Sequence, residues 1–180
     1  MPDLEQNKKI LEYAADVRKF EIGLFWTRSL FFWGFIAAAF VAYGVSIKES
    51  DKDIPLAIAC FGLVCSVAWT LVNRGNKYWH GAWEQKVESV QVEVLGRDLF
   101  SHIEPNRDLG WWGARRYSVT RLTIALSDFT VVVWLALGAK ASPIARGGSW
   151  DCVPVLMLAI TAVYVIAMLV GGLSRRPQVN

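Results

Sequence analysis

The chain has 180 residues, of which 54% are hydrophobic and nine are tryptophan, and its formal net charge is +3. The length suits one domain, or one domain with a small appendage. A soluble domain of this size rarely collects its apolar residues in long uninterrupted runs, so the composition disfavours a soluble protein. The weak positive charge requires no nucleic acid, because anionic lipid headgroups of the inner leaflet are a sufficient partner.

Four apolar runs dominate the chain. They cover residues 30–47, 54–72, 122–139 and 152–173, and the third contains one charge, Asp128. A helix needs about 20 apolar residues to cross about 30 Å of hydrocarbon, and the shorter runs can lengthen into flanking aromatic residues. The alternative, buried helices of a soluble protein, leaves too little other chain to cover them. We therefore expect an all-α membrane protein with four transmembrane helices.

Lysine and arginine are distributed unevenly between the segments outside these runs. Fifteen lie before the first run, between the second and third, or after the fourth, and four lie in the other two loops. By the positive-inside rule, both termini and the long middle segment are cytoplasmic. The predicted segments are a cytoplasmic amphipathic helix (1–28), a transmembrane hairpin (29–72), a cytoplasmic helix with an interfacial loop (73–117), a second transmembrane hairpin (118–174) and a cytoplasmic tail (175–180).

The segment before the first run is predicted to be an amphipathic helix. Its apolar side chains recur at helical spacing and form a stripe of Ile10, Tyr13, Ala14, Val17, Phe20 and Leu24. Trp26 and Arg28 close the segment and are predicted to lie at the membrane interface. The run has no cleavable signal peptide, so we expect it to be retained.

Small residues recur every four positions in the first two runs. Gly34 and Ala38 lie in the first run, and Gly62 and Ser66 lie in the second. Small residues at this spacing let helix backbones approach closely, which promotes association in lipid. We expect a tight bundle in which these residues make contacts within or between subunits.

The charged segment NRGNKYWHGAWEQKVESVQ follows the second run directly. Trp79, Trp83, Val87 and Val90 follow one another in steps of four, four and three, which places them on one face of a helix. This helix either continues from the second run or restarts at a kink near Gly75.

A loop of about six residues joins the first two runs, so their cytoplasmic extensions emerge side by side. The simplest way to bury both apolar stripes is against each other, or against the same pair in another subunit. Two alternatives stay open: the helix lies flat on the headgroups, or its tryptophans belong to the aromatic belt of the second span. Further along, Trp111, Trp112, Arg115 and Arg116 are predicted to lie at the inner-leaflet interface.

Hydroxyl side chains line one face of the third run, at Thr123, Ser127 and Thr130. Asp128 lies beside this face near mid-span, where a carboxylate costs roughly 2.5–3.5 kcal/mol on insertion scales. One interpretation is a pore lining or a proton or cation site. The other, which we favour, is a hydrogen bond between helices with the acid protonated, to Thr161 or Tyr164 of the fourth run.

No catalytic motif is visible. The three cysteines form no CxxC pair, and the two histidines are not spaced as metal ligands. We predict that the protein is not an enzyme and that it holds neither a cofactor nor a metal.

Three stretches together carry a resemblance to a known family: EIGLFWTRSLFFWGFIAAAF, NRGNKYWHGAWEQKVESVQ and GRDLF. They resemble the RipA-type family of octameric bacterial inner-membrane proteins, over roughly residues 17 to 101. The resemblance implies a homo-octamer in the bacterial inner membrane, linked to fitness under stress or inside a host, and supplies no catalytic residue. A looser similarity runs to small helical membrane effectors of anti-phage systems.

Two functional hypotheses follow. The first is a ring-like homo-oligomeric scaffold or gated pore, whose cytoplasmic helices assemble the ring or bind a cytoplasmic partner protein. The second is a small proton- or cation-coupled transporter centred on Asp128.

Overall fold

The computed structural model describes residues 2–48, 51, 53–95, 117–147 and 151–173. These residues form four α-helices and no strand: α1 (Pro2–Ser46), α2 (Asp53–Leu95), α3 (Val119–Ala141) and α4 (Cys152–Gly171), with a 3-10 turn, η1 (Ile144–Arg146), after α3. Each α-helix is long and apolar enough to cross a membrane. The predicted all-α architecture with four spanning helices is therefore confirmed.

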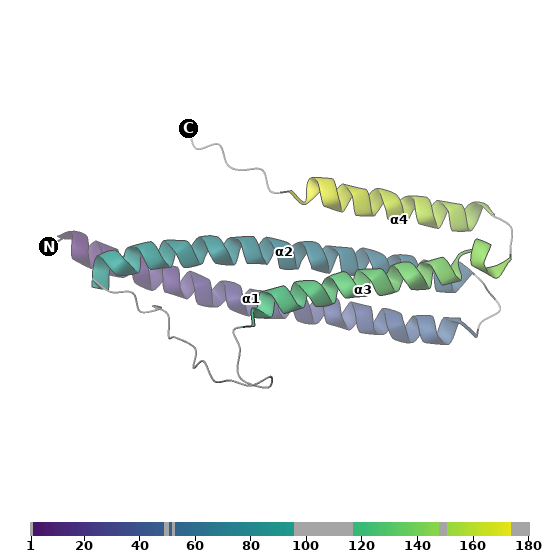
Figure 1. Ribbon diagram of the computed structural model, residues 1–180, viewed down its shortest axis with the longest axis horizontal. Helices are drawn as coiled ribbons and strands as arrows, with labels where there is room; N and C mark the ends of the chain where they lie inside the picture. Colours follow the sequence, from purple (N-terminus) through teal and green to yellow (C-terminus); the bar gives the residue numbers. More distant parts are fainter. Residues whose placement is uncertain (1, 49–50, 52, 96–116, 148–150, 174–180) are drawn as a thin grey trace, which may run out of the picture.

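Two of the helices are much longer than a bilayer is thick. α1 has 45 residues and α2 has 43, which corresponds to about 66 and 63 Å, against about 30 Å of hydrocarbon. They lie side by side, and α3 begins only partway along them (Figure 1). We call the part that projects past α3 the extension, residues 2–28 of α1 and 76–95 of α2.

The second helix does not break where its span ends. α2 runs without interruption through Gly75 and Asn76, so of the two predicted forms the continuous helix is the one found. Asp51 lies just before the helix, and its carboxylate accepts a hydrogen bond from the backbone N–H of Asp53, the first residue of α2, at 2.9 Å. Pro55 follows in the first turn, where a missing N–H costs nothing.

The face that α1 turns toward α2 follows a coiled-coil spacing. Ile36, Ala39, Tyr43 and Ser46 are buried and follow one another in steps of three, four and three. This alternation keeps one side of a helix in contact with a neighbour along its whole length. α1 and α2 therefore pack as an antiparallel pair.

Trp134 of α3 is the centre of the core within the membrane-spanning part. Its side chain is 0% exposed. Its ring stacks on Phe40 with centroids 4.4 Å apart and meets Tyr43 edge-on at 6.1 Å, so α3 is fixed to α1 as well as to α2. Gly62 of α2 makes the room for this ring, because a Cβ at that position would collide with the indole.

α4 packs against α2 alone among the described helices, and Figure 1 shows it set apart from α1 and α3. Pro154, in its first turn, is its one buried residue. Most of its large apolar side chains, such as Leu156, Val163 and Ile166, are exposed. α4 therefore turns most of its circumference toward lipid or toward another subunit.

Candidate functional site

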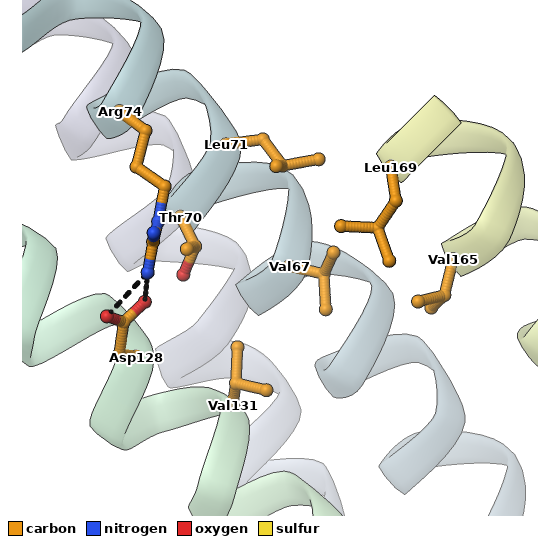
Figure 2. Close-up of a pocket in the computed structure, with 8 residues that line it drawn as sticks. All are labelled: Val67, Thr70, Leu71, Arg74, Asp128, Val131, Val165 and Leu169. Carbon is orange, nitrogen blue, oxygen red and sulfur yellow. Dashed lines mark hydrogen bonds and ion pairs between the residues drawn. The ribbon is translucent and has the colours of Figure 1, made fainter. Parts of the chain in front are cut away.

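A cleft of about 480 Å³ lies between α2, α3 and α4. α2 packs against both α3 and α4, but α3 and α4 do not pack against each other, and the cleft is the gap between these two helices. Figure 2 shows its wall, which is mainly apolar: Val67 and Leu71 from α2, Val131 from α3, and Val165 and Leu169 from α4. Two charged side chains, Arg74 and Asp128, also line it.

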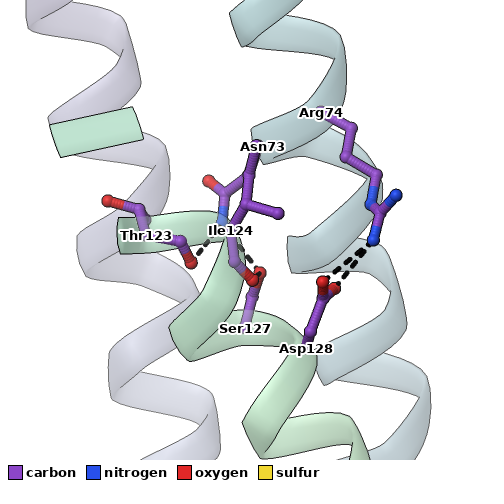
Figure 3. Close-up of polar contacts among 6 residues, drawn as sticks. All are labelled: Asn73, Arg74, Thr123, Ile124, Ser127 and Asp128. Atoms are coloured by element: carbon purple, nitrogen blue, oxygen red, sulfur yellow. Dashed lines mark hydrogen bonds and ion pairs between the residues drawn. The ribbon is translucent and has the colours of Figure 1, made fainter. Parts of the chain in front are cut away.

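These two charged side chains form an ion pair. One guanidinium nitrogen of Arg74 lies 2.9 and 3.1 Å from the two carboxylate oxygens of Asp128 (Figures 2 and 3). The side chains are 57% and 42% exposed, so the pair is not enclosed. An ionised partner at this distance stabilises the charged carboxylate, which explains how an acid is tolerated in an apolar span.

The partner of Asp128 corrects the expectation that it bonds to α4. Thr161 donates its hydroxyl hydrogen to the Met157 carbonyl of its own helix at 2.7 Å, and Tyr164 is 62% exposed. Neither contacts Asp128, because α3 and α4 do not pack together. The acid is held by α2 as an ion pair rather than by α4 as a protonated hydrogen-bond donor.

The adjacent residue, Asn73, binds the same helix from the inside. Its side chain is 0% exposed. Its amide nitrogen lies 3.3 Å from the Ser127 hydroxyl and 3.5 Å from the Thr123 carbonyl, as Figure 3 shows. Residues 73 and 74 of α2 thus hold α3 by two polar contacts on either side of one helical face.

The predicted hydroxyl face of α3 is turned toward the protein. Thr123, Ser127 and Thr130 are all buried. Each donates to a carbonyl of its own helix at 2.8 to 2.9 Å, so none of these hydroxyl hydrogens is free to serve water or an ion. The face is therefore a buried packing surface in the single chain, although the hydroxyl oxygens keep lone pairs that can accept a hydrogen bond.

A third polar contact joins α1 to α2. Arg28 donates to the side-chain carbonyl of Asn76 at 3.2 Å, and Asn76 is 7% exposed. Arg28, predicted as an interfacial residue, is thus also a link between helices. Trp26, its predicted companion, is 44% exposed.

The sequence analysis predicted no helix-helix contact for Asn73, Arg74 or Asn76. A signal was nevertheless present, because the buried positions of α2 continue without change from the apolar run into the polar segment. They are Gly62, Ser66, Trp69, Asn73 and Asn76, in steps of four, three, four and three. Polar residues that prolong such a series belong to the buried face and need partners there.

The apolar stripes of the extension are only partly buried within one chain. Val87 is 5% exposed and Ala14 is 3% exposed. Trp79 is 49% exposed and meets Tyr78 edge-on at 5.5 Å. About half of the Trp79 side chain is thus left uncovered by its own chain, and its packing within or between subunits stays a prediction.

The small residues of the first two spans differ in burial, depending on the helix that carries them. Gly62 and Ser66 are buried against α3, whereas Gly34 has no neighbour within 4 Å and Ala38 is exposed. Contacts of the first pair lie within the subunit, and the second pair is free for another subunit.

The remaining predicted residues lie outside the described part. The structure does not describe the side chains of Trp83 and Val90. It also does not describe four predicted interfacial residues, Trp111, Trp112, Arg115 and Arg116. Among the residues that are described, no group of three His, Cys, Asp or Glu side chains could hold a metal ion.

A family model described as "Octameric membrane protein family (8xMP)" matches residues 8–143. This range contains α1 from residue 8 onward, all of α2 and α3, and the ion pair, and it ends before α4. No curated protein and no solved structure matches the chain.

Proposed function

Because the chain belongs to the octameric membrane protein family, we propose that it acts as a homo-oligomeric membrane scaffold or gated pore whose extension joins the subunits. The family match confirms the expected octameric membrane family, whereas the narrower RipA-type name stays a prediction. A bacterial role in stress, host survival or defence is part of the proposal and rests on the resemblance alone. We propose no catalytic activity.

The observation that carries the proposal is the exposed apolar surface of the extension. Tyr13 and Phe20 of α1 are 69% and 64% exposed, and Tyr78 of α2 is 67% exposed. The extension also carries many charged residues and lies beyond the length of α1 and α2 that is needed to cross the bilayer, so lipid tails cannot cover these rings. Large exposed apolar side chains outside the membrane are typical of protein interfaces.

A second free surface lies within the spanning part of α1. A Cβ at Gly34 would meet no atom within 4 Å, and Ala38 is exposed at the edge of a groove that it lines with Ala57 and Phe61 of α2. A small-residue face that no helix of the same subunit covers suits close contact with a helix of the next subunit. The two surfaces lie on one helix and can be used by one neighbouring subunit.

The extension test replaces Tyr13, Phe20 and Trp79 by serine in one variant. We expect the detergent-solubilised particle to fall to a smaller mass, measured by native mass spectrometry or light scattering. The matched control replaces Val163 and Ile166 by serine. Both residues are on the exposed side of α4 and outside residues 8–143, so this variant should leave the mass of the particle unchanged. An unchanged mass in the serine variant would overturn the role of the extension in assembly.

The runner-up is a proton- or cation-coupled transporter centred on Asp128. Its support is that this carboxylate lines the cleft and is 42% exposed. The ion pair with Arg74 and the burial of the hydroxyl face argue against it. Flux measured in liposomes should be the same for the native protein and Asp128→Asn, and a coupled flux lost only in the variant would reverse the ranking.

We further propose that the extension and both termini face the bacterial cytoplasm, where basic side chains meet anionic lipids and a partner protein can reach the helices. A reporter active only in the periplasm should give signal when fused after Ser50 or Gly148, and none after Asp98. Signal at Asp98 would invert this topology.

A further inference from the structure

The cleft between α2, α3 and α4 combines an apolar wall with a pair of opposite charges at one end. Val67, Val165 and Leu169 face one another across it, and Arg74 and Asp128 lie to one side of them (Figure 2). Its volume, about 480 Å³, falls in the range of about 300–1,000 Å³ that is usual for small-molecule pockets. The occupant that fits this pattern is amphiphilic.

The backbone of Arg74 lies near the depth of lipid headgroups, and its side chain reaches inward to Asp128, which follows the start of α3 at Val119 by nine residues. Arg74 follows Asp53, at the start of α2, by 21 residues, which is about 31 Å of helix, against about 30 Å for the hydrocarbon layer. A lipid whose chain lies along Val67 and Val165 therefore has its headgroup beside the ion pair.

Both charged groups keep hydrogen-bonding capacity. Only one guanidinium nitrogen of Arg74 contacts Asp128, and no other polar partner of either side chain occurs among the described residues. A guanidinium has five N–H donors and suits phosphate, and a carboxylate can accept from several donors. The pair can thus serve a cation and an anion at the same time.

The proximity of the two charges selects between headgroups. A headgroup with only negative charge would be attracted by Arg74 and repelled by Asp128 at nearly equal distances. A phosphoethanolamine headgroup offers a phosphate to Arg74 and a primary ammonium, with three donors, to Asp128. Phosphocholine has the same charges but no N–H to donate.

We propose that this cleft binds one glycerophospholipid with a phosphoethanolamine headgroup, its phosphate on Arg74, its ammonium on Asp128 and an acyl chain against the α2 and α4 side chains. The lipid would fill the gap between α3 and α4 and join α4 to the rest of the bundle. The proposal does not depend on what the assembled protein does.

The test uses the full chain, purified in detergent and delipidated, with dioleoyl lipids that differ only in headgroup. Native mass spectrometry should show phosphatidylethanolamine bound roughly tenfold or more tightly than phosphatidylcholine or phosphatidylglycerol, because charge-assisted hydrogen bonds are lost with the other two. Asp128→Asn should remove the preference for ethanolamine over choline. Equal binding of all three lipids, or tighter binding of phosphatidylglycerol, would overturn the proposal.

A second variant leaves the ion pair intact. Val165→Phe fills the cleft and should reduce retention of phosphatidylethanolamine, whereas Val163→Phe on the exposed side of α4 should not. If Val165→Phe instead lowers the mass of the oligomer and leaves lipid retention unchanged, another subunit covers the cleft and the lipid site is wrong.

Discussion

α3 and α4 are two apolar helices of similar length, 23 and 20 residues, that are held in very different ways. α3 buries Thr123, Ser127, Thr130 and Trp134 at helical spacing, and polar contacts from Asn73 and Arg74 hold it to α2. α4, the more uniformly apolar of the two, has a single buried residue, Pro154.

The contrast shows that hydrophobicity drives a helix into the membrane without deciding what it packs against. In lipid, apolar side chains gain little by leaving the lipid tails, so close packing and polar contacts decide association. α3 has a large ring that meets a glycine, together with polar partners on its neighbour, and α4 has few such features. The segment that matches the family ends between these two helices.

The largest effect should come from Trp134→Ala. The side chain is fully buried between α1, α2 and α3, and truncating a buried tryptophan costs about 3–5 kcal/mol. Unfolding of the detergent-solubilised protein should shift strongly to lower denaturant or temperature. Leu156→Ala in α4, at a 60% exposed position, is the matched control and should change stability little. Comparable losses in both variants would contradict the difference between the helices.

A smaller effect is expected from Gly62→Val. The new side chain would occupy the space of the Trp134 indole, and overpacking of this kind costs about 1–3 kcal/mol. Gly171→Val, near the end of α4 where nothing lies within 4 Å, is the control and should be tolerated. If thermal unfolding shows both glycine variants equally stable, the close approach of α2 and α3 is not as described.

The smallest change in stability is expected from removing a polar contact between helices. Asn73→Ala removes the hydrogen bond to Ser127, and such bonds inside membranes average about 0.6 kcal/mol with a maximum near 1.7. Thr161→Val removes a hydroxyl that bonds only within α4, and its effect should be about zero. Chemical unfolding curves of the two variants should therefore differ in midpoint. Coincident curves would show that the polar contact between α2 and α3 does not help to hold α3.

The sequence was sufficient to predict the spans and the face of α3. Charge-free runs that are long enough to cross a bilayer are typical of transmembrane helices and rare in soluble domains. The hydroxyl spacing of three and four residues fixed which side of α3 carries Thr123, Ser127 and Thr130.

The partner of Asp128 was not predictable in the same way. Hydropathy gives the depth of each residue along its own helix but not which helices touch, and a choice between α2 and α4 required the packing. The expectation favoured α4, because α3 and α4 are consecutive, whereas α2 is the neighbour observed.

The buried side of α2 departs from the predicted stripe at Trp79 for a geometric reason. Residues four apart on an α-helix advance by about 40° per step, so a series such as Trp79, Trp83 and Val87 winds away from one side. The buried side of α2 instead follows Asn73, Asn76 and Val87, which includes polar residues that an apolar pattern overlooks.

The unbroken course of α1 and α2 also has a mechanical consequence. Two rods of about 66 and 63 Å that pass through the membrane surface, with about half of their length on either side, act as levers pivoting there. A rotation of about 10° shifts the far tip of α1 by about 7 Å, because residues 2–28 form an arm of about 39 Å. With no hinge at Gly75 to absorb the rotation, a change in tilt at either end is transmitted to the other at nearly full amplitude.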